Sequence, residues 1–511
     1  MGKKKLRQLI QEHPYGILAL GTVLSVVVSN LLMALGLPEM ALILGIFFLM
    51  GCILTYLGYR FFKKTLDLRS FLIATAVLSF LLRLAYILST PYSSRQYDVD
   101  FIGTPTGHLG YMEYLLAHGF RLPDFDPTTV WQYYHPPLHY YLGAIFLGLQ
   151  SILHLPKTLA VENLQFMGLF WSGVLLIVSY RIFRALNLRG RGLIAAFALM
   201  AFHPAWTFMS GTLNNDMAVQ ALSALALYFT IVWYKDRSLR SILYIGIFLA
   251  LAMLTKASAA LLIPAIGVSF VVGFIQDHEK LRLLKQFGWF LLVSVPLGLS
   301  FAVYNLLRWG MPLNFVQPMP DNHVEFIGDY PLVERFTDLN WIQLKVPWRM
   351  FMQPSVDHNI FIGMLKTSLF GEGNFFGPAS VFNHLASFLF YLNIFLVVLA
   401  LGAMVLLVLR KHRDLTGGMK VFLMTLYLTL MGSFVNFNIA SPYMCTYNYR
   451  YIPLTMMIGA FFLGFLLNRL EDKTLSYGRR RTGWLGLVVY GLVLLFVFSS
   501  AGLYMVLCVR G

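Results

Sequence analysis

Long apolar runs separated by short polar and basic stretches dominate this chain of 511 residues. A helix that crosses the hydrocarbon core of a bilayer needs about 20 apolar residues, and the pattern predicts thirteen such spans. They are expected near residues 15–36, 41–60, 69–90, 160–181, 192–212, 217–234, 241–256, 259–276, 287–308, 380–409, 419–438, 452–469 and 484–506. The sequence therefore predicts an all-α, polytopic integral membrane protein.

Composition supports lipid as the main solvent of the chain. Hydrophobic residues make up 58% of the sequence and charged residues only 12%, against about 45–50% and about 25% in soluble domains. The net charge of +16 is spread over short clusters and forms no single patch, so we expect no nucleic-acid partner. Cys52, Cys445 and Cys508 are too few and too scattered for a disulfide framework or a metal motif.

The basic clusters predict the orientation of the spans. Cytoplasmic loops carry an excess of Lys and Arg, and thirteen spans with a cytoplasmic amino terminus put every cluster on that side. The clusters are Lys3–Arg7, Arg60–Arg69, Arg181–Arg191, Lys235–Arg240, Lys280–Lys285, Arg410–Lys420 and Arg469–Arg481. The first apolar run lacks a small-residue cleavage site, which favours a retained span over a signal peptide. We expect a multi-pass plasma-membrane protein, or one of the endoplasmic reticulum if the source is eukaryotic.

The apolar run at residues 136–154 is long enough to be an additional span, which would change the number of spans from odd to even. If it crossed the membrane, Arg181–Arg191 and every later cluster would move to the outer side. We therefore interpret it as an interfacial or re-entrant helix on the outer side, which is tolerated where other helices bury it.

Two long segments are then predicted on the outer face, at residues 91–159 and 309–379. Loops of this length are usually functional, and twelve of the chain's 23 acidic residues collect in the two segments. These acids are Asp98, Asp100, Glu113, Asp124, Asp126, Asp321, Glu325, Asp329, Glu334, Asp338, Asp357 and Glu372. The resulting division is an amino-terminal hairpin (1–68), a transmembrane core with the first outer loop (69–308), the second outer segment (309–379) and carboxy-terminal helices (380–511).

Asp98 and Asp100 follow directly after a predicted span and are separated by one residue. Two carboxylates at this spacing can share a divalent cation such as Mg²⁺ or Mn²⁺, or one can serve as a general base. The alternative is a solvated turn at a helix end. The sequence leaves open which carboxylate is the base and whether a metal is bound.

Histidines and tyrosines crowd the same outer loop, including His108, Tyr111 and the stretch from Trp131 to Tyr141. Two prolines after His135 are suited to the first turn of a helix, which would make His135 its cap and place His139 one turn along the same face. This pair could bind a metal, although no third ligand is evident. We favour contact with substrate, and the alternative is an aromatic belt at the lipid interface.

Two further polar residues lie near the outer ends of spans. Arg83 falls inside the third span, where charged residues are usually functional or paired, and Glu162 is its candidate partner; snorkelling to the surface is the alternative. Asp216 begins the sixth span and is a candidate substrate contact, but we expect it to cap the helix that follows.

Three outer cations, Lys256, Lys366 and Arg450, run against the trend of basic residues on the cytoplasmic side. Such cations suit phosphate, and Arg binds it in a bidentate manner. Each could also be a solvated surface charge. Together with the outer acids, among them Glu372, they predict a divided site with one part for an anion and one for acid–base chemistry.

These features together resemble the GT-C superfamily of membrane glycosyltransferases. The likeness is greatest to bacterial members related to protein O-mannosyltransferases and aminoarabinose transferases. It extends over about residues 69–469 and is most specific over 95–142. The motifs that carry it are Asp98 with Asp100, Gly107-His108, Tyr111, Pro136-Pro137-Leu138, Asn215-Asp216, Leu254-Thr255-Lys256 and Arg450-Tyr451-Ile452-Pro453.

The resemblance implies a sugar donor carried on a polyprenyl phosphate, with a lipid, glycan or protein acceptor at the outer face. It also implies a catalytic carboxylate in the first outer loop, which corresponds to Asp98 with Asp100 as the alternative, and an inverting displacement. Arg450, Lys256, Lys366 and Arg83 would bind the donor phosphate. The chain departs from the family in the two extra spans at 15–60 and in Val99, which separates an acidic pair that is often adjacent.

Other classes of function remain open on the sequence alone. A secondary transporter or lipid flippase would also be polytopic, but many transporter folds show internal repeats and sites at the bilayer midplane. No repeat is visible here, and the notable charges lie in the two outer segments. A non-catalytic scaffold is the third class, and such a protein would tolerate the loss of Asp98.

Overall fold

The computed structural model describes residues 12–313, 315–320, 322–350, 353–372, 380–477 and 480–510. Within these residues, twelve helices are long and apolar enough to cross a membrane. A shorter apolar helix of 17 residues, Leu239–Thr255, coincides with the seventh predicted span, at 241–256. The all-α, polytopic membrane fold is thus confirmed. Lys3–Arg7, Asp321 and residues 478–479 of the last basic cluster lie outside the described residues.

Helices account for the regular structure of the described residues, whose single isolated β-bridge joins Phe326 and Tyr443. In chain order the elements are α2 (Pro14–Ala34), α3 (Glu39–Phe62), α4 (Leu68–Leu88), α5 (Gly107–Ala117), η1 (Pro127–Thr129), α6 (Leu138–Ile152), α7 (Lys157–Glu162), α8 (Gln165–Ala185), α9 (Gly190–Phe202), α10 (Pro204–Ser210), α11 (Asp216–Asp236), α12 (Leu239–Thr255), η2 (Ala257–Leu262), α13 (Ile263–Gln276), α14 (Lys280–Trp309), α15 (Leu332–Thr337), α16 (Trp341–Lys345), α17 (Ile360–Phe370), α18 (Ser380–Leu409), α19 (Gly417–Ala440), η3 (Met444–Tyr447), η4 (Tyr449–Tyr451), α20 (Leu454–Tyr477) and α21 (Arg480–Arg510).

The chain forms two compact units. The first consists of Met1–Tyr180, Thr207–Ala221 and Tyr504–Gly511, and the second of Arg181–Trp206 and Leu222–Leu503. The first unit therefore contains the predicted first outer loop, and the second unit contains the second outer segment.

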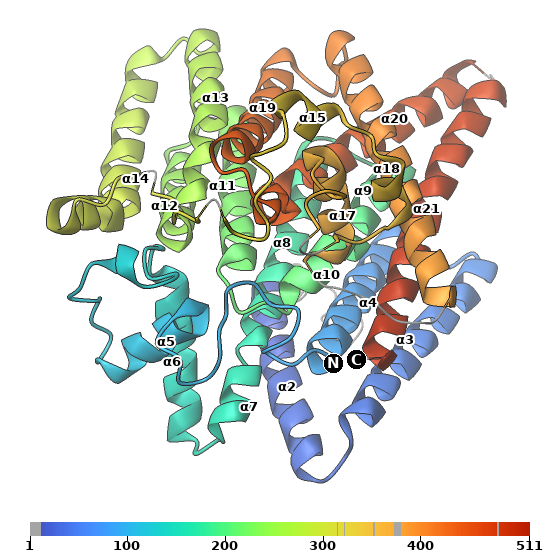
Figure 1. Cartoon of the computed structure of the whole chain (residues 1–511). Helices are drawn as coiled ribbons and strands as arrows, with labels where there is room; N and C mark the ends of the chain where they lie inside the picture. Colours follow the sequence, from blue (N-terminus) through green and yellow to red (C-terminus); the bar gives the residue numbers. More distant parts are fainter. Residues whose placement is uncertain are drawn as a thin grey trace. The chain divides into compact units, whose positions relative to one another are not determined.

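The first unit begins with the hairpin of α2 and α3, drawn in blue in Figure 1. Only 11% of the apolar window of either helix is buried within the chain, against 67% in α4. Because both hairpin helices are apolar all round, lipid must cover the surface that the protein leaves exposed. The helix α4, in contrast, is a core element of its unit.

The apolar run that followed His135 forms α6, which has 15 residues. This length is below the roughly 20 residues that a spanning helix needs, in agreement with the prediction that the run does not cross as a full span. The helix packs against α5 and α7, around a core that includes Leu109, Leu115 and Ala144.

In the second unit, α9 and α20 pack closely because glycines face each other at their contact. A Cβ atom on Gly192 would lie 2.2 Å from the main-chain oxygen of Gly464, and one on Gly464 would lie 2.5 Å from the oxygen of Gly192. Only glycine allows this approach. At the start of α9, the Asn468 side chain accepts the Arg189 N–H at 3.1 Å and donates back to its oxygen at 2.6 Å.

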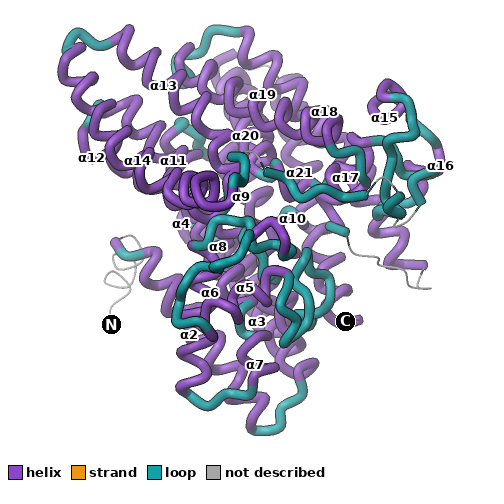
Figure 2. The backbone as a smooth tube through the Cα atoms, turned by 60° about the vertical axis from the view of Figure 1, so that its left-hand side comes forward, coloured by secondary structure: helices purple, strands orange, loops and turns teal. Residues whose placement is uncertain are grey.

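The second outer segment consists of short helices and extended connections, seen as teal loops around α15, α16 and α17 in Figure 2. The helix α17 packs against α18 and against the short 3-10 turns η3 and η4. These turns follow α19 in sequence and contain the predicted phosphate-binding Arg450. The second outer segment thus braces the part of the chain that presents this cation.

Candidate functional site

The two predicted catalytic carboxylates lie on one irregular turn of the first unit. Along residues 97–100, which we call the carboxylate turn, Tyr97 and Val99 are buried, while Asp98 and Asp100 are exposed. Both aspartates have positive φ angles, 55° and 66°, a conformation that Asp adopts more readily than most residues. The alternation places both carboxylates on the accessible side of the turn and anchors the turn through its apolar residues.

The two carboxylates have different surroundings. Both oxygens of Asp100 are engaged locally, one by the Phe101 N–H at 2.9 Å and the other by the Thr106 hydroxyl. These bonds hold Asp100 within the turn itself. Asp98 is linked to α5 by its main-chain oxygen, which accepts the His108 N–H at 2.9 Å.

Gly107 makes the close approach of α5 to the carboxylate turn possible. Its φ is +74°, and a Cβ atom there would lie 2.6 Å from the Val99 oxygen and 2.8 Å from the Asp100 Cβ. The next two amides, of His108 and Leu109, bond to the main-chain oxygens of Asp98 and Val99. The Gly-His pair in the sequence is therefore a backbone requirement as well as a source of the imidazole.

His108 is buried behind this turn with an aromatic neighbour that the sequence reading missed. Its Nδ1 is 2.7 Å from the Tyr140 hydroxyl, and its ring stacks on His135 with centroids 5.8 Å apart. Electrostatic interactions link Tyr140 to both Asp98 and Asp216, and burial together with these charges holds the pKa of Tyr140 well above its usual value. The structure thus groups His108, His135 and Tyr140 next to the carboxylate turn.

The predicted pairing of His135 with His139 on one helical face is wrong. The helix α6 begins at Leu138, and its cap residue is Pro137, so His135 precedes the helix and stacks on His108. The ring of His139 instead points into the core, where Nε2 lies 2.8 Å from the Leu213 oxygen. Burial lowers the pKa of His139 to about 4, so its imidazole is neutral at pH 7.

Tyr111 is a core residue of the first unit. It is 0% exposed, and its ring lies between those of Tyr133 and Tyr140, with centroid distances of 4.6 and 4.3 Å. Its ring supports Tyr140, the hydrogen-bond partner of His108. Any influence of Tyr111 on a substrate would therefore pass through this aromatic stack.

The structure shows the hydrogen-bond partners of Asp216, which was expected to cap a helix, and of Arg83, for which pairing with Glu162 or snorkelling was expected. Asp216 is the first residue of α11, and the cap bond comes from the Asn214 side chain, whose oxygen accepts the Asp216 N–H at 3.1 Å. Arg83 is 2% exposed and donates to the Ser172 oxygen at 3.2 Å, so it does not snorkel. Glu162, its predicted partner, instead accepts from the Tyr92 N–H and from Gln165.

Two of the three predicted outer cations meet in the second unit at a tyrosine ring. The Arg450 guanidinium lies 5.2 Å from the centroid of Tyr451 and the Lys256 ammonium 5.6 Å from it. Arg450 also donates to the Tyr451 hydroxyl at 3.3 Å. Two positive charges on one aromatic ring can bind a phosphate, which would relieve their mutual repulsion.

Lys366 has a different environment. Its side chain and that of Asp357 are both 0% exposed, and the ammonium lies 2.7 Å from the carboxylate. Burial lowers the pKa of Lys366, and Asp357 opposes this effect by favouring the charged form. The structure thus presents Lys366 as half of an interior ion pair.

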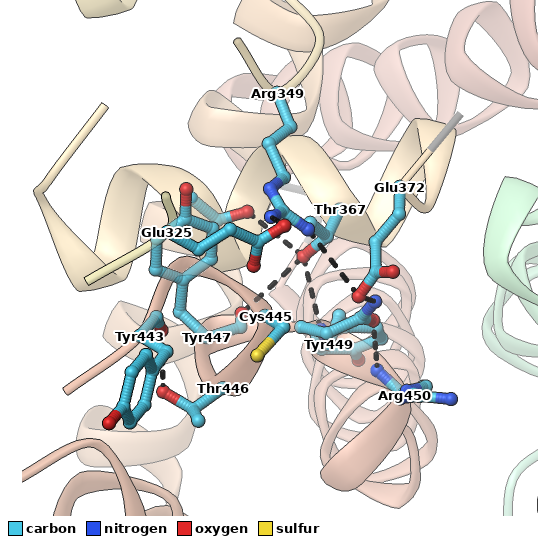
Figure 3. Close-up of polar contacts among 12 residues, drawn as sticks. Glu325, Arg349, Thr367, Glu372, Tyr443, Cys445, Thr446, Tyr447, Tyr449 and Arg450 are labelled. Carbon is cyan, nitrogen blue, oxygen red and sulfur yellow. Dashed lines mark hydrogen bonds and ion pairs between the residues drawn. The ribbon is translucent and has the colours of Figure 1, made fainter. Parts of the chain in front are cut away.

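A second buried ionic cluster lies near Arg450. The sequence analysis missed it because it did not single out the cation of this cluster, Arg349. Arg349 is 1% exposed and lies 2.5 Å from Glu325 and 3.5 Å from Glu372, as Figure 3 shows. Burial disfavours its charge, but Tyr447 and the two acids outweigh burial and raise the pKa of Arg349. An arginine in a predicted outer segment is unusual under the positive-inside trend, and this signal could have identified it.

The structure offers no ready-made metal centre in its described part. Among those residues, no group of three or more His, Cys, Asp or Glu is arranged to hold an ion. Each oxygen of Asp100 accepts one hydrogen bond from the protein, which leaves further lone pairs on the carboxylate. Metal binding by the carboxylate pair stays a prediction.

Residues 134–304, a third of the chain, match the protein family described as dolichyl-phosphate-mannose-protein mannosyltransferase. The resemblance to membrane glycosyltransferases of the GT-C superfamily is thereby confirmed for this stretch. No curated protein is similar enough to the chain to count as a match.

Solved structures similar to this chain include archaeal oligosaccharyltransferase AglB from Archaeoglobus fulgidus with an inhibitory peptide and a dolichol-phosphate (13% identity, 86% of this chain and 56% of that chain, TM-score 0.46). The Archaeoglobus fulgidus oligosaccharyltransferase in complex with Zn and sulfate is another (14%, 84% and 53%, TM-score 0.43). A third is ArnT from Cupriavidus metallidurans bound to undecaprenyl phosphate (12%, 80% and 81%, TM-score 0.36). The chain spans about half the length of the matched oligosaccharyltransferase.

Proposed function

We propose that this protein is a membrane glycosyltransferase that transfers a sugar from a polyprenyl-phosphate donor to an acceptor hydroxyl at the outer face of the membrane. The observation that carries the proposal is the carboxylate turn, which presents an accessible aspartate on a backbone fixed by α5. The family match at residues 134–304 supports the reaction class. Lipid, glycan and protein acceptors all fit this chemistry.

Asp98 is the general base of the proposed reaction. Its carboxylate takes the proton of the acceptor hydroxyl as that oxygen attacks the anomeric carbon. The bond from this carbon to the phosphate oxygen breaks, and its electron pair leaves with the polyprenyl phosphate, so the anomeric centre is inverted. Asp100 supports the turn, because its own oxygens are engaged by Phe101 and Thr106.

Arg450 and Lys256 of the second unit are the candidate ligands of the donor phosphate. Both are cationic and share the Tyr451 ring, and donors held in advance of the reaction need little reorganisation as charge develops. We do not assign this role to Lys366, because its charge is matched by Asp357 in the interior. Arg83 is not assigned this role either, because it is only 2% exposed and donates to the Ser172 oxygen.

The decisive experiment measures sugar transfer by the purified protein from a panel of polyprenyl-phosphate sugars. Asp98→Asn should lower turnover by about 10²–10⁴-fold, because Asn keeps the shape of Asp but cannot accept the proton. Asp124→Asn, which changes an exposed acid of the same outer segment, is the matched control and should remain active. Asp100→Asn should be milder than Asp98→Asn.

A chelator decides between a metal-free base and a shared cation. If the wild type keeps its rate in chelator and only Asp98→Asn fails, Asp98 acts without a metal. If chelator silences the wild type and both aspartate variants fail alike, the carboxylate pair binds an essential cation. Ordinary turnover in Asp98→Asn would remove the base assignment. Failure of every donor in the panel would contradict the proposed reaction and favour lipid transport.

A further inference from the structure

The backbone N–H of Arg450 is held by the residue two positions before it. Asn448 is 0% exposed and caps the short turn η4. Its side-chain oxygen accepts the Arg450 N–H at 3.0 Å, and its side-chain NH₂ donates to Glu372 at 2.7 Å. One buried amide therefore links the backbone of the cation to a carboxylate of the second outer segment.

The charge of Glu372 determines which way this amide faces. A carboxylate only accepts hydrogen bonds, so the NH₂ group of Asn448 must point toward Glu372. The amide oxygen is then left for the Arg450 N–H. A reversed amide would oppose oxygen to carboxylate and NH₂ to N–H, and both bonds would be lost.

Glu372 is fixed in turn by the buried cluster beside it. Arg349 lies 3.5 Å from Glu372 and 2.5 Å from Glu325, and Figure 3 shows its guanidinium between the two acids. The main-chain oxygen of Glu325 accepts the Met444 N–H at 2.9 Å. The same cluster therefore holds the loop that leads to Arg450 from two sides.

We propose that Asn448 and Glu372 are positioning residues that hold Arg450 in the orientation that binds the donor phosphate. The inference rests on the proposed function, in which Arg450 binds that phosphate. It goes further by assigning Asn448, Glu372 and the buried Arg349 cluster to the preparation of the anion site before the donor arrives. A pre-arranged arginine loses less conformational freedom when it binds.

The proposal is tested by exchanging the chemical groups of the Asn448–Glu372 pair. Asn448→Asp puts two carboxylates face to face and should weaken binding of undecaprenyl phosphate by about 10-fold or more. Glu372→Gln keeps an oxygen that can accept from Asn448, so its effect should be smaller. The double variant Asn448→Asp/Glu372→Gln restores one donor and one acceptor with the original net charge. We expect its affinity to return to within about threefold of the wild type.

Two controls separate positioning from general damage. Asn340→Asp alters the asparagine that caps α16 by accepting the Ile342 N–H at 2.9 Å, and it should leave phosphate binding unchanged. In an Arg450→Ala background, Asn448→Asp should cause no further loss of affinity, because there is no guanidinium left to position. The proposal would be overturned if Asn448→Asp lowered the phosphate affinity equally with Arg450 and with Ala at position 450. It would also be overturned if the double variant had the wild-type free energy of unfolding but did not recover its affinity.

A second readout keeps this inference distinct from the proposed function. The rate at which phenylglyoxal modifies Arg450, followed by mass spectrometry of the full chain, reports its placement without any lipid. We expect the rate to change in Asn448→Asp and to return to the wild-type value in the double variant. If wild-type protein does not bind undecaprenyl phosphate but this pattern holds, the proposed function fails and the positioning role stands. An unchanged rate in Asn448→Asp contradicts the positioning role.

Discussion

The buried pair of Lys366 and Asp357 allows a quantitative test of whether an outer cation serves the fold or the donor. Both side chains are 0% exposed and 2.7 Å apart, and the second carboxylate oxygen accepts the Met350 N–H at 2.9 Å. Lys366→Met removes the ammonium and leaves the carboxylate buried without its counterion. Breaking a buried pair on one side costs about 3–5 kcal/mol of unfolding free energy.

Asp357→Asn and the double variant together measure the coupling energy between Lys366 and Asp357. Asp357→Asn leaves the lysine charge unmatched and should cost a similar amount. The variant Lys366→Met/Asp357→Asn removes both charges, while the introduced amide oxygen can still accept from Met350. We expect it to lose only about 2–3 kcal/mol, well below the sum of the single losses, with a coupling of at least about 3 kcal/mol.

The assay is reversible unfolding of the purified protein in mixed micelles, followed by equilibrium binding of undecaprenyl phosphate to each folded variant. The double variant should bind the phosphate as the wild type does, because the pair supports the fold. Additive losses in unfolding free energy would refute the buried-pair reasoning. Normal stability of Lys366→Met with abolished phosphate binding would show instead that Lys366 contacts the donor.

Three further predictions concern the first unit and the topology. Gly107→Ala should abolish transfer because its Cβ would clash with the carboxylate turn. The control Gly103→Ala has a similar φ of +83° but nothing within 4 Å of its Cβ, so it should cost only about 1 kcal/mol of unfolding free energy and keep activity. Equal activity of the two variants would contradict the role of Gly107 in the close approach of α5. The pKa of His139 falls from 6.5 to about 4 on folding, so between these values the unfolded chain binds more protons, and about 3 kcal/mol of stability present above pH 6.5 should be lost as the pH falls to 4. His139→Gln should flatten that part of the unfolding profile, and an unchanged profile would exclude His139 as its source. In a chain with its native cysteines replaced, a cysteine introduced at the exposed Arg121 should react with an impermeant reagent from outside the cell and one at the exposed Arg191 should not, and the reverse labelling would overturn the predicted orientation.

The sequence by itself determined the membrane fold, because lipid imposes a local requirement. Each spanning helix needs a long apolar run of its own, and such a run is visible without knowledge of its neighbours. The distribution of basic residues predicted that the run at 136–154, which forms α6, does not cross the membrane as a full span. The sequence also singled out Asp98, Asp100 and Arg450, since charged residues are rare in this chain and those at span ends stand out.

The partners of the charged groups were decided only by tertiary structure. Glu372 meets Arg349 across 23 positions of sequence and Asn448 across 76 positions, and no local pattern reports such distances. For the same reason the sequence reading treated Lys366 as an outer cation, although the structure buries it with Asp357.

The histidines show the same division at short range. Helical spacing paired His135 with His139, but the helix starts at Leu138, and His135 stacks instead on His108 from another helix. Helix starts depend on which backbone groups find partners outside the helix as well as on the preceding prolines. The sequence thus determined which residues carry charge near the predicted outer face, and tertiary contacts decided which of those charges hold the fold and which remain accessible.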